Sequence, residues 1–104
     1  MTTKVVEITS REEYENFKKN RRAVIFYGAK WCDACTYIHN LYERIANRYH
    51  KHVKLAYVDI DVCELDFSAV PIFVSLRKGQ QLNSMEGADK KGLKQLIKEV
   101  IQAE

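Results

Sequence analysis

Hydrophobic and polar residues follow one another along the chain in a pattern that predicts five β-strands. Residues 23–27 form a continuous apolar run rich in β-branched and aromatic side chains, which is typical of a strand buried on both faces. Gly79 falls in a polar turn between two of the strands, where it can accept a positive φ and allow a hairpin. The strands are expected at residues 4–8, 23–27, 53–60, 72–76 and 81–86.

The pattern also predicts three amphipathic helices. Thr9 and Ser10 precede Glu12 and Glu13 as two overlapping capping boxes, so the first helix should begin there. A long second helix follows the first two cysteines, and the residues expected on its buried face are Tyr37, Ile38, Leu41, Tyr42, Ile45, Ala46 and Tyr49. The third helix, with Asp89 as its expected N-cap, has its apolar stripe at Leu93, Leu96, Ile97, Val100 and Ile101.

The order of these elements predicts the fold class. It reads β-α-β-α-β and then β-β-α, which indicates an α/β protein with a central mixed sheet flanked by helices on both faces. A chain of 104 residues is expected to form a single domain over residues 1–104. No linker, internal repeat or low-complexity tract interrupts it.

Composition and charge exclude several classes of function. The chain is 46% hydrophobic and 30% charged, which is typical of a folded globular protein. Its net charge of +3 is spread along the chain, so a mixed solvated surface with a mild preference for acidic partners is favoured over nucleic-acid binding. No segment approaches a membrane span, and the first residues lack the apolar stretch of a signal peptide, so we expect a monomeric cytoplasmic protein.

Cys32 and Cys35 carry the strongest chemical signal. They lie between a predicted buried strand and a long helix, which places Cys32 at the helix N-terminus, where the dipole and free N–H groups lower the pKa of a thiol. Cys32 would then attack a disulfide, and Cys35, deeper in the helix, would resolve the mixed disulfide. The total of three cysteines fits a functional pair and one spare in a reducing compartment.

The alternative for this pair is a structural zinc site. Zinc needs four ligands, and His39 could be the third. Cys63, His50 and His52 are the remaining donors, but they form no second paired motif, so redox chemistry is favoured and no metal is expected.

The run from Val24 to Cys35, with Trp31 before the first cysteine, resembles the active-site segment of the thioredoxin family. Later blocks resemble that family in the same order: Val58-Asp59-Ile60-Asp61, Val70-Pro71-Ile72-Phe73, Arg77-Lys78-Gly79-Gln80 and Glu86-Gly87-Ala88. The resemblance implies a thioredoxin fold and a cis Pro71 facing the disulfide. It also implies that Val70 pairs its backbone with an extended substrate, and that Trp31, Pro71, Gly87 and Ala88 form an apolar groove around the sulfurs.

The sequence departs from that family at positions that tune the chemistry. Asp33-Ala34 replaces the usual Gly-Pro, and a carboxylate at this point should raise the pKa of Cys32 relative to a neutral spacer. Phe26 stands where the family commonly has a buried acid, and Tyr57 where it often has the paired lysine. Loss of both charges spares the fold, and water or Asp33 is then expected to accept the Cys35 proton.

Two further departures concern the segment before Pro71. Only nine residues separate Asp61 from Pro71, so the helix usual at this point in the family is expected to be short or absent. Cys63 is interpreted as a buried structural cysteine, with glutathionylation or chain-to-chain linkage as the alternative.

Three functions remain open at this point. The favoured one is reduction of protein disulfides in cell redox homeostasis and electron transport, with no cofactor beyond the Cys32–Cys35 disulfide and with a thioredoxin reductase or glutathione as electron donor. A thioredoxin-like binding module with little turnover is the second. A glutathione-dependent, glutaredoxin-like variant is the third.

Overall fold

A mixed five-stranded sheet forms the centre of the computed structural model, which describes residues 3–103. The strand order is β1-β3-β2-β4-β5. Strands β1 and β2 run parallel to β3, whereas β4 is antiparallel to β2 and β5 to β4. The sheet confirms the predicted fold class. Its strands are β1 (Val6–Ile8), β2 (Arg22–Gly28), β3 (Lys54–Asp59), β4 (Ile72–Arg77) and β5 (Gln80–Glu86).

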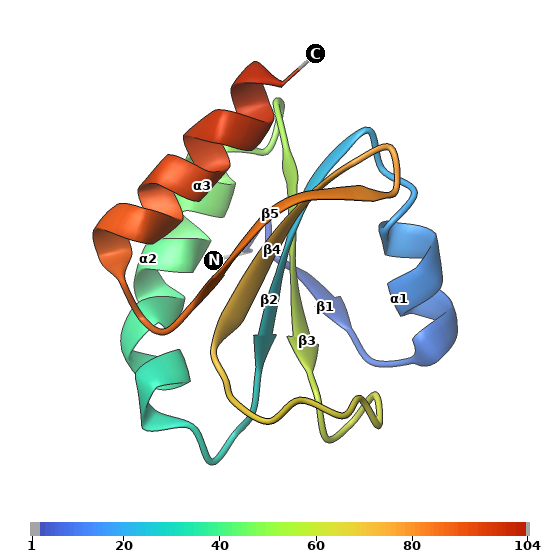
Figure 1. Cartoon of the computed structure of the whole chain (residues 1–104), viewed down its shortest axis with the longest axis vertical. Helices are drawn as coiled ribbons and strands as arrows, with labels where there is room; N and C mark the ends of the chain where they lie inside the picture. The colour runs from blue at the N-terminus through green and yellow to red at the C-terminus, as the bar shows by residue number, and fades with distance from the viewer. Residues whose placement is uncertain (1–2, 104) are drawn as a thin grey trace.

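Helices cover both faces of this sheet. Helices α2 (Asp33–Tyr49) and α3 (Lys90–Gln102) lie side by side on one face, and α1 (Arg11–Phe17) lies on the other (Figure 1). The β2–α2 and β3–β4 connections meet at the same end of the sheet, at the bottom of Figure 1. No helix within residues 3–103 has the length and apolar character needed to cross a membrane.

The capping box predicted before α1 is present. Ser10 is the N-cap, and its Oγ accepts the Glu13 N–H at 3.1 Å. The Glu13 carboxylate accepts the N–H and the hydroxyl of Thr9, at 3.1 and 2.8 Å, and these bonds lower the pKa of Glu13. In a standard capping box the Glu13 side chain would bond the N–H of the N-cap residue. Here it bonds Thr9, the residue before the N-cap, because Thr9 offers both a backbone and a side-chain donor.

Strand β2 lies at the centre of the core, and every residue from Ala23 to Ala29 is buried. The apolar stripes of α2 and α3 pack against it as predicted, apart from Tyr37. That side chain is 61% exposed because it lies one position outside the stripe, where the Lys90 Nζ sits 4.7 Å from its ring centroid. Asp89 occupies the N-cap position of α3, but its side chain makes no capping hydrogen bond.

The connection between β3 and β4 contains no α-helix, as its short length predicts. A turn over residues 61–64 closes with the Leu65 N–H donating to the Ile60 carbonyl at 2.8 Å. The chain then runs irregularly to the Val70–Pro71 peptide bond, which is cis as the family resemblance implies. Lys78 and Gly79 form the hairpin turn, with φ of 52° and 84°, which is the left-handed backbone that a two-residue hairpin turn requires.

Candidate active site

Cys32 is the N-cap of α2. The preceding turn holds its N–H on the Ala29 carbonyl at 3.2 Å, and its Sγ accepts the N–H of Cys35 at 3.1 Å. A sulfur in this position meets the unsatisfied N–H groups and the positive end of the helix dipole, both of which favour a thiolate over a thiol. The structure therefore confirms the predicted position of Cys32 at the helix N-terminus.

Cys32 and Cys35 are joined by a disulfide, with Cα atoms 5.2 Å apart. Cys32 is 6% exposed and Cys35 is 3% exposed, so Cys35 is the deeper of the two. A structural zinc site would need four ligands, and within residues 3–103 no three His, Cys, Asp or Glu side chains are grouped to hold a metal ion. The geometry is that of a pair that exchanges electrons with another disulfide.

Gly28 ends strand β2 directly beneath the pair. A Cβ at this position would lie 2.8 Å from Cε1 of Tyr57, 3.1 Å from Cε1 of Phe26 and 3.2 Å from Sγ of Cys35. Any side chain here would displace Cys35 or the two rings. A glycine at the end of a buried strand, just before a cysteine motif, is the sequence signal that could have indicated this close approach.

The Val70–Pro71 segment brings the Val70 carbonyl to the disulfide and is bonded to Gly87. The Val70 carbonyl oxygen is 3.6 Å from Sγ of Cys32, and Pro71 is buried. The N–H of Gly87 donates to the Pro71 carbonyl at 2.8 Å, and the neighbouring Ala88 is half-buried against the core. The structure therefore brings together segments that lie far apart in the sequence.

Trp31 stands at the outer edge of the pair. Its side chain is 65% exposed, so it is not a core aromatic, and its Nε1–H donates to Oδ2 of Asp61 at 2.8 Å. The Asp61 backbone is held in turn by its N–H, which donates to Oδ1 of Asp59 at 2.9 Å. The role of Asp61 was missed, because it depends on β3 ending beside the active-site turn.

An aromatic cluster occupies the place of the buried charged pair found in the family. Phe26 has no exposed surface, and its ring centroid lies 4.6 Å from Phe73, 4.9 Å from Tyr57 and 5.1 Å from Tyr42. Tyr57 is partly buried. Its burial, followed by the nearby carboxylates with Asp59 first among them, raises its pKa to about 12. Close aromatic packing, edge-to-face toward Tyr42 and Tyr57 and tilted toward Phe73, takes the place of the ion pair.

Cys63 is 2% exposed, and its thiol faces the Ile8 carbonyl at 3.6 Å. Burial raises its pKa, and the Asp59 carboxylate adds to the effect. The predicted burial of Cys63 is confirmed.

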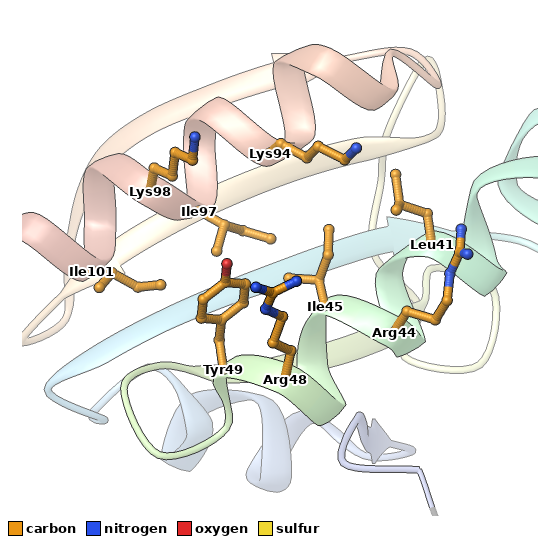
Figure 2. A pocket seen from close by; sticks show the side chains of 9 residues that line it. All are labelled: Leu41, Arg44, Ile45, Arg48, Tyr49, Lys94, Ile97, Lys98 and Ile101. Atoms are coloured by element: carbon orange, nitrogen blue, oxygen red, sulfur yellow. The ribbon is translucent and has the colours of Figure 1, made fainter.

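A separate hollow of about 440 Å³ lies between α2 and α3 (Figure 2). Ile45 and Ile97 lie on its two sides, and Arg44, Arg48 and Lys94 border it. Its lining residues on α2 begin at Leu41, well beyond Cys35 on that helix, so it is distinct from the surface around the cysteines.

A disulfide at a helix N-terminus, opposite a cis-proline at one end of this sheet, defines a thiol–disulfide oxidoreductase of the thioredoxin fold. Comparison with known proteins agrees. The thioredoxin family model matches residues 4–99, so the chain belongs to the thioredoxin family.

Individual relatives support the assignment. Thioredoxin of Ovis aries is 30% identical over 95 residues, which cover 86% of this chain and 90% of that protein. The structure of Malassezia sympodialis thioredoxin matches with a TM-score of 0.87 at 26% identity, covering 96% of this chain and 93% of the other. The TPR repeat-containing thioredoxin TDX of Arabidopsis thaliana is 33% identical over 103 residues. That match takes in 89% of this chain but only 27% of the plant protein, so this chain corresponds to about a quarter of it.

Proposed function

We propose that the protein reduces disulfide bonds in other proteins. The Cys32 thiolate attacks a substrate disulfide, and one substrate sulfur leaves. Cys35 then attacks Cys32, the mixed disulfide breaks, and the second substrate thiol is released with the Cys32–Cys35 disulfide formed. The observation that carries the proposal is the sulfur of the helix N-cap Cys32, 3.6 Å from the Val70 carbonyl oxygen and backed by the buried Cys35.

Substrate binding follows from the same surroundings. An extended substrate strand would pair with the backbone of Val70, and its apolar side chains would contact Trp31, Pro71 and the Gly87-Ala88 turn. The exposed Trp31 ring and the partly buried Val70 support this mode of binding. The disulfide itself is the redox centre, and the proposal needs no further cofactor.

Reduction of insulin disulfides by dithiothreitol tests the proposal directly. The wild-type protein should accelerate the reaction, and the matched variant Cys32→Ser should not. A wild-type rate equal to that of the variant would refute reductase activity.

The electron donor is proposed to be a thioredoxin reductase or glutathione in a reducing cytoplasm. The two donors are separated by coupling the insulin assay first to NADPH with thioredoxin reductase, and then to glutathione with glutathione reductase. Turnover with the second system alone would indicate a glutaredoxin-like enzyme.

A binding module with little turnover is the second candidate. Phe26 in place of the family's acid and the helix-free β3–β4 connection favour it, because both depart from the family next to the cysteines. The variant Cys35→Ser separates the two functions. An active enzyme accumulates mixed disulfides through Cys32, whereas a binding module retains its partners without a covalent bond even as Cys32→Ser.

A further inference from the structure

Cys35, His39 and Glu43 follow one another at intervals of four residues along α2. Residues four apart lie on the same face of a helix, with Cβ atoms about 5–6 Å apart. The three side chains span the range from core to solvent, because Cys35 is 3% exposed while the side chains of His39 and Glu43 are 33% and 35% exposed. A nucleophile, an imidazole and a carboxylate thus form one row.

His39 and Cys35 share two packing neighbours, Phe26 and Tyr57. The Cys35 sulfur and the ring edges of Phe26 and Tyr57 all border Gly28, since a Cβ on that glycine would meet all three within 3.2 Å. The His39 ring packs on the same two rings, with its centroid 5.8 Å from Phe26 and 5.4 Å from Tyr57. Helical side chains also lean back over the preceding turn, which for His39 is the turn that carries Cys35.

Glu43 lies one helical turn beyond His39 and approaches its Nδ1. Its Oε1 lies 3.7 Å from Nδ1 of His39. A carboxylate beside Nδ1 favours the tautomer with its proton on that nitrogen, which leaves the lone pair on Nε2. The row therefore has the order of a nucleophile, a base and a group that orients the base.

The other titratable groups near Cys35 are less suited to accept its proton. Asp33 is exposed and lies two positions away, and residues two apart do not face each other on a helix. Tyr57, with a pKa of about 12, keeps its own proton at neutral pH. The charged groups acting on Tyr57 are Asp59, Glu7 and Asp61, and all of them are carboxylates that favour the protonated phenol.

We propose that His39 accepts the proton of Cys35 during resolution of the mixed disulfide, with Glu43 as its positioning residue. The Cys35 S–H bond breaks and its proton passes to Nε2 of His39. The Cys35 sulfur bonds to the Cys32 sulfur, the Cys32–substrate S–S bond breaks, and the substrate sulfur leaves with the electron pair. The imidazolium then returns its proton to solvent or to the departing thiolate. This step rests on the proposed reductase function.

Stopped-flow reaction with one equivalent of the disulfide reagent DTNB separates the two chemical steps. The reduced protein carries Cys63→Ala in every variant, so that only the active-site pair reacts. Release of the first thionitrobenzoate reports attack by Cys32, and release of the second reports resolution by Cys35. Both rates are measured from about pH 5 to about pH 8, the range over which imidazole titrates.

In His39→Gln, the second phase should slow about 100-fold at neutral pH, the lower end of what a positioned general base contributes, while the first phase is unchanged. The wild-type rate of the second phase should fall at acid pH, where an imidazole is protonated. It should become constant at higher pH, where an imidazole is neutral. The His39→Gln rate should instead keep rising about tenfold per pH unit, because only ionisation of the thiol remains. Glu43→Gln should give an intermediate loss.

His52→Gln is the matched control, since this exposed histidine lies beyond the far end of α2. A second phase with the same rate and pH profile in His39→Gln and His52→Gln would overturn the role of His39. If the second phase of His39→Gln were slow but kept the wild-type dependence on pH, the effect of the substitution would be structural and the proposal would also be refuted. A wild-type first phase no faster than that of a free thiol would instead refute the proposed function.

Discussion

Replacing Phe26 by aspartate tests whether the aromatic cluster has become incompatible with the acid that the family commonly carries there. Phe26 is fully buried among Tyr42, Tyr57 and Phe73, with ring centroids 4.6 to 5.1 Å away. The reference variant is Phe26→Ala, which removes the ring without adding a charge. It should lower the free energy of unfolding by about 3–5 kcal/mol, the usual cost of removing a buried phenylalanine.

Phe26→Asp leaves a comparable cavity and adds a carboxyl group that faces Tyr57 where the family often has a lysine. Burial without a cation should raise the pKa of this carboxyl by about three pH units or more. At about 1.4 kcal/mol per unit, the carboxylate then costs about 4 kcal/mol at neutral pH. Below about pH 4 the new carboxyl group is neutral in both the folded and the unfolded protein. The loss in free energy of unfolding beyond that of Phe26→Ala should therefore begin near pH 4 and grow until the pH reaches the folded-state pKa.

Urea unfolding of the oxidised protein at about pH 4 and about pH 7.5 measures the difference. Phe26→Asp and Phe26→Ala should differ by less than about 1 kcal/mol in acid and by about 4 kcal/mol at the higher pH. Adding Tyr57→Lys to Phe26→Asp should recover much of that difference, because the pair would again be complete. A difference that does not change with pH would show that the site is wetter or more polar than the packing indicates.

Three further outcomes follow from single contacts. Asp61→Ala removes the acceptor of the Trp31 indole N–H. The fluorescence anisotropy of this sole tryptophan should fall, while stability changes by less than about 1 kcal/mol because the bond is exposed; unchanged anisotropy would contradict the contact. Cys63 should react with iodoacetamide at least about tenfold more slowly in the folded than in the urea-unfolded protein, since burial raises its pKa; equal rates would contradict its burial. Absorbance at the phenolate band, taken as wild type minus Tyr57→Phe, should titrate near pH 12, and a midpoint near the ordinary tyrosine value would refute the effect of burial.

Much of the fold could be predicted because its signals are local. The all-apolar run of β2, the capping box at Ser10 and the glycine turn at Gly79 each specify an element from a few neighbouring residues, and each was found. Tyr37 was assigned to the wrong side of α2, because two adjacent apolar residues near a helix start leave its facing ambiguous. Asp89 was placed correctly, but its side-chain bond depends on loop geometry that no short pattern encodes.

The candidate site likewise has features that could be predicted from local sequence and features that could not. The Cys32–Cys35 pair and its place at the helix start follow from spacing alone. The bond from Trp31 to Asp61 and the close approach at Gly28 could not be predicted, because both depend on the register between β2 and β3. Pairing of Gly28 with Asp59 brings the end of β3 beside the active-site turn. No property of either segment alone indicates that contact.

The departures from the family are coupled to one another. Taken one at a time, Phe26 and Tyr57 are losses of charge and His39 is a histidine without catalytic spacing. In the structure their three rings contact one another, and two of them border Gly28 together with the Cys35 sulfur. A buried acid at position 26 would remove one of the two rings on which the His39 imidazole packs. The two rings that stand in place of the charged pair therefore also provide the surface on which His39 packs. A variant that restores the acid should accordingly disturb the position of His39 as well as the stability of the sheet.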